Sequence, residues 1–184
     1  MNYFILLQDN RISDAIEPVG VSKVLTRELL DEENAHELEA MNLQFFIKDK
    51  AKNEYVDYLQ TPAPLLSDPL KQLLQKYDKH TYFQSVVLTD LKKMRQETYW
   101  LMLPPKVDCM SLQSEFHKDG TLRRLVIDEH KAKAVSHRIF QVDGIRETCI
   151  IINLAVAESL LRRDFTGIRL IQAEKQSQVT PERG

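Results

Sequence analysis

The chain has 184 residues, 43% of them hydrophobic and 28% charged, and a formal net charge of −2. This composition excludes an intrinsically disordered protein, and the length suits one domain with a sizeable core. Because surfaces that bind nucleic acid or anionic lipid are usually basic, we expect neither a nucleic-acid nor a membrane partner.

Residues 1–7 are apolar but lack the marks of a secretory leader, since no basic residue precedes them and Asp9 and Arg11 follow at once. No run approaches the roughly 18 apolar residues of a membrane-spanning helix. The two cysteines, Cys109 and Cys149, are too few for a disulfide framework, so we expect both to be reduced thiols. These features favour a cytoplasmic protein.

The first third of the chain predicts strands that flank an acidic segment. Residues 3–7, 43–47 and 55–59 have the apolar patterns of strands. Between the first two strands the sequence is rich in acids, namely Glu28, Asp31, Glu32, Glu33, Glu37 and Glu39. A run of charge is typical of a solvated helix face, and it also suits a surface that attracts a basic partner.

The middle of the chain opens on two prolines. Thr61-Pro62-Ala63-Pro64 favours an extended linker, a candidate boundary between an N-terminal lobe, 1–60, and a main lobe, 62–172. A helix then begins, because Asp68 is a capping residue and Pro69 suits the first helical position. Its apolar stripe consists of Leu70, Leu73, Leu74 and Tyr77.

The remaining strands are expected at 83–88, 98–103, 122–127, 138–142, 146–152 and 168–171. The strand at 98–103 is apolar on both faces, which predicts a central strand covered on both sides and places Trp100 in the core. Asp143-Gly144 predicts a type I′ hairpin, Asn153 caps a helix over 154–163, and residues 173–184 form a flexible polar tail. These elements predict an α+β fold, a largely antiparallel sheet with a few packed helices, in a single domain over 1–172.

Candidate chemistry is sparse in this chain. Cys109, His117 and Cys149 lack the paired spacing of zinc ligands, so we expect no metal and no cofactor. Asp108 and His117 lie near Cys109, but no nucleophile elbow or oxyanion glycine accompanies them, and Asp108 suits a turn. We therefore expect a protein that is not an enzyme.

Basic residues cluster between 123 and 138. Arg123 and Arg124 lie on the same predicted strand and should therefore point to opposite faces. Only Phe140 is near enough to stack on a base, whereas a platform for single strands needs aromatics at alternate positions. An RNA-binding face is therefore not expected.

Short motifs follow one another between residues 62 and 172. They are Pro64-Leu65-Leu66-Ser67 before the helix at Asp68, Tyr99 to Pro104, Asp108, Ser114-Glu115, Ile139-Phe140 with Val142, Ile150 to Ile152, the helix 154–163, and Thr166-Gly167-Ile168. This order resembles a bacterial family of immunity proteins from polymorphic toxin systems. The resemblance implies a small cytoplasmic protein that binds and neutralises a cognate toxin domain, and it carries no catalytic residues.

We hypothesise that the acidic segment contributes to the surface that faces the toxin. Many toxins of such systems are nucleases, and a nuclease cleft is basic because it holds phosphates, so an acidic surface would steer association with it. The alternative is an enzyme, or a protein that binds a small molecule or nucleotide, with a site assembled from scattered residues. The neighbouring genes discriminate between the two, because a gene with a variable C-terminal toxin domain favours immunity.

Overall fold

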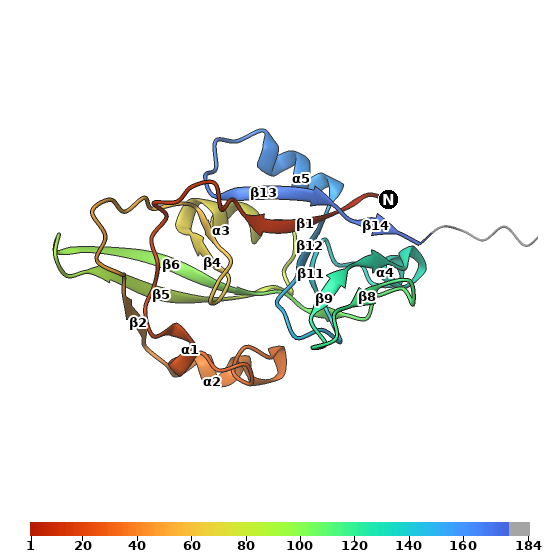
Figure 1. Ribbon diagram of the computed structural model, residues 1–184, viewed down its shortest axis with the longest axis horizontal. Helices are drawn as coiled ribbons and strands as arrows, with labels where there is room; N and C mark the ends of the chain where they lie inside the picture. The colour runs from red at the N-terminus through yellow and green to blue at the C-terminus, as the bar shows by residue number, and fades with distance from the viewer. Residues whose placement is uncertain (177–184) are drawn as a thin grey trace, which may run out of the picture.

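The protein is built around two five-stranded β-sheets (Figure 1). The computed structural model describes residues 1–176, apart from the side chain of Glu32. The first sheet has the order β13 (Ile168–Gln172), β1 (Tyr3–Gln8), β12 (Ile150–Asn153), β11 (Ile139–Val142), β7 (Lys106–Val107). The second has the order β2 (Leu43–Phe46), β5 (Tyr82–Asp90), β6 (Arg95–Leu103), β4 (Leu65–Ser67), β3 (Tyr58–Leu59). Each sheet is antiparallel except for one edge pair, β11 with β7 and β2 with β5, which confirms the predicted α+β class.

Smaller elements complete the described chain. Two short sheets pair β8 (Glu115–Phe116) with β9 (Leu122–Arg124), and β10 (Val126–Ile127) with β14 (Glu174–Lys175). The helices are α1 (Val21–Val24), the 3₁₀ turn η1 (Glu32–Asn34), α2 (Ala35–Glu39), α3 (Asp68–Leu74), α4 (Glu129–Ala134) and α5 (Leu154–Leu161). None of the helices within residues 1–176 has both the length and the apolar character that a membrane crossing requires.

Polar side chains fix the starts of three helices. Asn153 caps α5 as predicted, since its Oδ1 accepts a hydrogen bond of 3.1 Å from the Val156 amide. The predicted helix at Asp68 exists, but its cap is Ser67, whose Oγ accepts from the Leu70 amide at 3.4 Å. Asp128 caps α4, a short helix that the sequence pattern did not predict.

The two sheets share one central cluster of apolar side chains. Leu6 and Ile150 of the first sheet meet Leu66 and Met102 of the second in this cluster. The predicted stripe of α3 fills it from one side, together with α5, through Leu70, Leu73, Leu74, Val156, Ala157 and Leu160. The other face of the second sheet is covered by α1, α2 and the segment that follows β1.

Hydrogen bonds of a buried carboxylate, that of Asp78, connect the two sheets. The Asp78 side chain, 3% exposed, lies in the turn before β5 and accepts hydrogen bonds from the amides of His80 at 2.8 Å and Arg138 at 3.1 Å. His137 Nδ1 lies 3.3 Å from the same carboxylate. Asp78 therefore joins the second sheet to the loop that leads into β11. We call a carboxylate that accepts hydrogen bonds from two separate segments of the chain a joint carboxylate; Asp78 is one, and Asp57 is a second.

Strands from both sides of Thr61 share each sheet. β3 pairs with β4 across the Thr61–Pro64 segment, and β1 lies between β12 and β13. The candidate lobes 1–60 and 62–172 are thus interleaved.

Three local expectations differ from the structure. β11 and β12 pair as predicted, but residues 143–149 connect them, and only Gly144 has a positive φ, so no type I′ turn forms. Residues 173–176 are not the start of a flexible tail as predicted, because Ala173 is buried and Glu174 and Lys175 form β14. The rest of that prediction, residues 177–184, lies outside the described part. β6 is covered on both faces only in its second half, since Thr98 is exposed and Trp100 is half-buried.

Candidate functional site

The residues predicted to bind a partner lie on one segment, residues 25–40, that packs against the second sheet. Leu25 and Leu38 are 3% and 0% exposed and anchor the segment in the cluster that contains Val86 of β5. Asn34 Nδ2 donates a hydrogen bond of 2.8 Å to the Glu28 carbonyl, which closes the turn before α2. Figure 1 shows α1 and α2 together on the side of the β5–β6 hairpin opposite α3.

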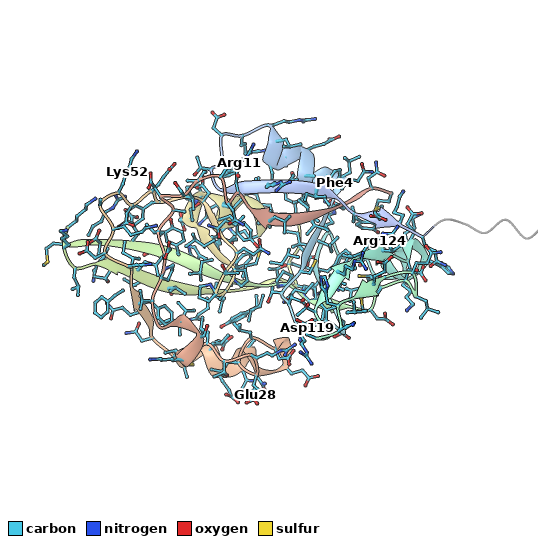
Figure 2. The ribbon with its side chains drawn as sticks, in the orientation of Figure 1. Phe4, Arg11, Glu28, Lys52, Asp119 and Arg124 are labelled. Carbon is cyan, nitrogen blue, oxygen red and sulfur yellow. The ribbon has the colours of Figure 1, made fainter. Side chains whose placement is uncertain are left out.

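The structure divides the six predicted acids into groups. Four are exposed and form no ion pair with any described residue, namely Glu28, Glu33, Glu37 and Glu39. Figure 2 shows Glu28 at the outer rim of the molecule. Asp31 differs, because it is half-buried and bonds to Lys106 of β7. The sixth acid is Glu32, whose side chain lies outside the described part.

Four carboxylates of this segment, Glu28, Glu33, Glu37 and Glu39, have no cation partner among the described residues. About half of the other carboxylates of the described chain have a Lys, Arg or N-terminal cation within 4 Å, including Asp9, Glu17, Glu97, Glu115, Glu129, Glu158 and Glu174. Exposed carboxylates without such a cation project a field beyond the surface and attract a basic partner. The Asp31–Lys106 pair, by contrast, tethers the segment to the first sheet.

Several residues of the motifs that resemble the immunity family, including Ser67, Thr166 and Gly167, connect separate segments of the fold. Asp57, just before β3, accepts hydrogen bonds from Ser67 Oγ at 2.5 Å and from the Thr166 amide at 2.7 Å. Gly167 has a φ of +77°, and a Cβ there would lie 2.7 Å from the Val56 Cβ. Thr166-Gly167 is therefore required for the close approach of the α5–β13 connection to β3.

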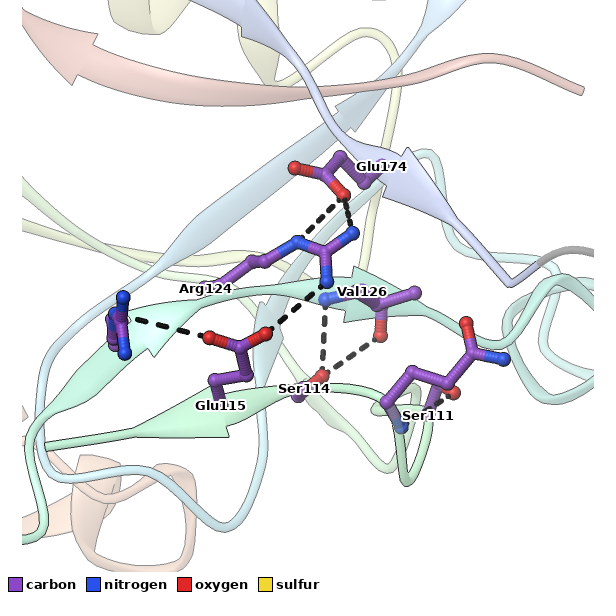
Figure 3. Close-up of polar contacts among 8 residues, drawn as sticks. Ser111, Ser114, Glu115, Arg124, Val126 and Glu174 are labelled. Carbon is purple, nitrogen blue, oxygen red and sulfur yellow. Dashed lines mark hydrogen bonds and ion pairs between the residues drawn. The ribbon is translucent and has the colours of Figure 1, made fainter.

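The Ser114-Glu115 motif is a second joint (Figure 3). Ser114 Oγ both donates to the Val126 carbonyl and accepts from the Val126 amide, each at 3.0 Å. Glu115 contacts Arg124 at 3.3 Å and Arg123 at 3.8 Å. The expectation that the two arginines point to opposite faces is therefore wrong, because a register shift at Glu115/Phe116 breaks the alternation.

The two cysteines are free thiols with raised pKa values. Burial raises the pKa of Cys109 to about 12, and that of the half-buried Cys149 to about 12 as well. A thiol with so high a pKa is protonated at neutral pH and is a poor nucleophile. The neighbouring Asp108 pairs with Lys131 at 3.1 Å. Within residues 1–176, no three His, Cys, Asp or Glu side chains gather as a metal site would require.

Sequence reasoning missed one open cleft of about 470 Å³ between the segment after β1 and the Leu59–Pro62 turn. Gln8, which lines the cleft, forms a reciprocal pair with Gln60, in which the amide of Gln8 donates to Gln60 Oε1 and that of Gln60 to Gln8 Oε1, both at 2.9 Å. The walls are mostly uncharged polar and apolar groups, with Glu17 at one side. No motif marks these residues, because they come together only through the pairing of distant strands.

No family model, curated protein or solved structure matches the chain. The immunity assignment therefore stays a hypothesis that the order of the motifs motivates. The structure distinguishes motif residues such as Ser67, Ser114 and Thr166, which hydrogen-bond within the fold, from four carboxylates of the acidic segment, which are exposed and form no ion pair with any described residue.

Proposed function

We propose that the protein is an immunity protein that binds a cognate toxin domain in the cytoplasm and neutralises it. The observation that carries the proposal is the acidic segment, in which four carboxylates face solvent on a segment that Leu25 and Leu38 hold in place. Such a surface suits a basic cleft, because it supplies charge where a nuclease holds phosphates. The motif order between residues 62 and 172 supports the same proposal by resemblance.

Electrostatic attraction acts mainly on the association rate. The test variant is Glu28→Gln/Glu33→Gln/Glu37→Gln, which omits Asp31 because that residue is tied to Lys106. A matched control, Glu54→Gln/Glu158→Gln/Asp164→Asn, removes the same charge from exposed acids elsewhere.

The probe is the purified C-terminal domain of the protein encoded by the gene next to this one, which the proposal expects to be a toxin. With the test variant, the association rate should fall about tenfold at low salt, and its dependence on ionic strength should flatten. The control variant should associate with the toxin domain like the wild type. Equal rates for both variants and full protection of cells that express the toxin would remove the acidic segment from the interface.

The second candidate is a protein that binds a small molecule, and the 470 Å³ cleft is the observation that favours it. Its volume lies within the usual range of ligand sites, about 300–1,000 Å³. A neighbourhood of metabolic genes, together with a failure to bind any adjacent toxin domain, would favour this candidate over immunity.

A further inference from the structure

The chain contains two Asp-Gly pairs, and in only one of them are the aspartate carboxyl and the glycine amide in contact. Asp143-Gly144 opens the connection between β11 and β12, and Asp119-Gly120 forms the turn between β8 and β9. Both aspartates are exposed, and both glycines have a positive φ, +79° at Gly144 and +84° at Gly120. The two pairs therefore differ in their hydrogen bonds rather than in the backbone conformation of their glycines.

At Asp143-Gly144 the amide and the carboxyl contact each other. The Gly144 amide donates to Asp143 Oδ1 at 2.9 Å, which brings its nitrogen next to the Cγ atom that carries this oxygen. No carbonyl among the described residues accepts a hydrogen bond from this amide. The Asp143 amide donates to the Val107 carbonyl at 3.0 Å, so the main chain before Cγ is fixed. The Gly144 nitrogen and the Asp143 carboxyl are thus close together, and no main-chain acceptor within the described part competes for the amide.

At Asp119-Gly120 both groups have other partners. Asp119 Oδ1 accepts from the Thr121 amide at 2.9 Å and from the Thr121 hydroxyl at 2.6 Å. The Gly120 amide donates instead to the His117 carbonyl at 3.0 Å. The hydrogen bonds from Thr121 also lower the pKa of Asp119, which keeps its carboxyl ionised. Arg146 Nη1 donates to the Asp119 carbonyl at 2.9 Å and so restrains this turn further.

We propose that Asp143-Gly144 is a site of spontaneous covalent modification, at which Asp143 becomes isoaspartate through a cyclic succinimide. The Gly144 nitrogen attacks Cγ of the protonated carboxyl, the N–Cγ bond forms, and one Cγ–O bond breaks as water leaves with the amide proton. Glycine suits this step because it has no Cβ that would hinder the closing ring.

Water then opens the succinimide at one of its two carbonyls. Addition at Cγ restores aspartate, whereas addition at the main-chain carbonyl of Asp143 gives isoaspartate, in which the main chain runs through Cβ and Cγ. The sequence of steps needs no oxidant, cofactor or partner, and it is therefore separate from the proposed function.

The modified residue lies beside the acidic segment. Asp143 and Gly144 border a cavity of about 90 Å³ together with Arg27 and Asp31 of that segment. Isoaspartate keeps the charge of the carboxylate but displaces it, and it lengthens the main chain of the β11–β12 connection by a methylene. Conversion therefore alters the loop against which this part of the acidic segment lies.

Both Asp-Gly pairs can be followed in the same molecule. The full chain is incubated at about pH 5, where a small fraction of an ordinary aspartate is protonated, and its peptides are analysed by mass spectrometry over time. Succinimide appears as the loss of one water, and electron-transfer fragmentation distinguishes isoaspartate from aspartate of the same mass. Asp143 should convert at least about tenfold faster than Asp119, because Asp119-Gly120 must first break its competing hydrogen bonds.

Two variants and an unfolded control separate the causes. Asp143→Glu keeps the charge but would have to close a larger ring, so conversion at this position should stop while that of Asp119 is unchanged. Thr121→Val removes the hydroxyl donor to Asp119 and should speed conversion of Asp119 several-fold without affecting Asp143. In the wild-type chain unfolded in guanidinium, both pairs lose their contacts and should convert at rates within about threefold of each other.

Three results would overturn the inference. If Asp119 converts as fast as Asp143 in the folded chain, the contact between Gly144 and Asp143 gives no advantage. If neither converts in the folded chain while both convert in guanidinium, the fold protects Asp143 from ring closure. If the rates differ as much in guanidinium as in the folded chain, the difference comes from the local sequence and not from the hydrogen bonds of the fold.

Discussion

Carboxylates in the joints and carboxylates in the acidic segment are the same chemical group in opposite settings. Asp57 and Asp78 accept several hydrogen bonds each, and the Asp78 side chain is 3% exposed. Glu28 and Glu37 are exposed and have no ion-pair partner within the described residues. A joint carboxylate therefore stabilises the fold, and an exposed carboxylate leaves its charge available to a partner. Substitutions in the joints should therefore cost more stability than substitutions in the acidic segment.

Gly167→Ala should cause the largest loss of stability, about 2–4 kcal/mol. The substitution combines the cost of a left-handed residue with a Cβ placed 2.7 Å from the Val56 Cβ. The matched control is Gly20→Ala, because Gly20 has a φ of +75° but nothing within 4 Å of its added Cβ. The control should lose only about 1–2 kcal/mol in urea unfolding. Equal losses would show that the joint at Thr166-Gly167 does not require the close approach.

Asp78→Ala should destabilise the protein by about 2–4 kcal/mol, because the amides of His80 and Arg138 lose their acceptor in a buried site. Asp78→Asn keeps one acceptor oxygen and should cost less than Asp78→Ala. Urea midpoints with an unchanged slope provide the measurement. A loss below about 1 kcal/mol for Asp78→Ala would contradict the role of Asp78 as a joint.

Glu129 is neither a joint carboxylate nor a carboxylate without a partner, because it forms ion pairs with the Met1 ammonium and Lys175 near the surface. The hydrogen bonds from the Met1 ammonium at 2.8 Å and then from Lys175 lower its pKa from 4.5 to about 2. Because the folded pKa lies below the unfolded one, the contribution of Glu129 is complete above about pH 4.5 and is lost as the pH falls toward 2. The stability gap between wild type and Glu129→Gln should therefore be widest near neutral pH and should close in acid. A gap that does not change between neutral pH and acid would contradict this assignment.

Asp31→Asn should have the smallest effect, about 0.5 kcal/mol or less, because its pair with Lys106 is partly solvated. Glu37→Gln, which touches no cation, is the control and should leave the melting temperature unchanged. A loss above about 2 kcal/mol for Asp31→Asn would mean that the ion pair, rather than Leu25 and Leu38, holds the acidic segment in place.

Elements with a strong local signal could be predicted from the sequence. The prediction of α3 rests on its apolar stripe, Leu70, Leu73 and Leu74, and that of α5 on its N-cap, Asn153. Apolar runs predict β1, β5 and β6. α4 was missed because its six residues carry a single buried side chain, Ala132, although Asp128 is a usable capping signal.

The arrangement of the site could be predicted only in part. Composition identifies the acidic segment, but only the fold shows that Asp31 meets Lys106, which is 75 residues away in the chain. The bulge that brings Arg123 and Arg124 onto Glu115 has no local signature either. The exposure of Gln44 and Phe46 was within reach of sequence reasoning, because alternation along β2 separates them from the buried Leu43 and Phe45.

The position of β1 in the first sheet determines when that sheet can close during synthesis. β1 is made before every other described strand, yet its partners are β12 and β13, as in the pairing of Leu6 with Ile150. The second sheet pairs only segments from β2 to β6 and can assemble earlier. At about 5–20 residues per second, β1 waits on the order of ten seconds for its neighbours. The nascent chain thus carries an unpaired apolar strand, and proteolysis of chains stalled before β12 should cleave β1 while sparing β5 and β6. Because β1 is synthesised first and lies between two strands that are synthesised last, it is the apolar segment that is accessible to a chaperone for the longest time.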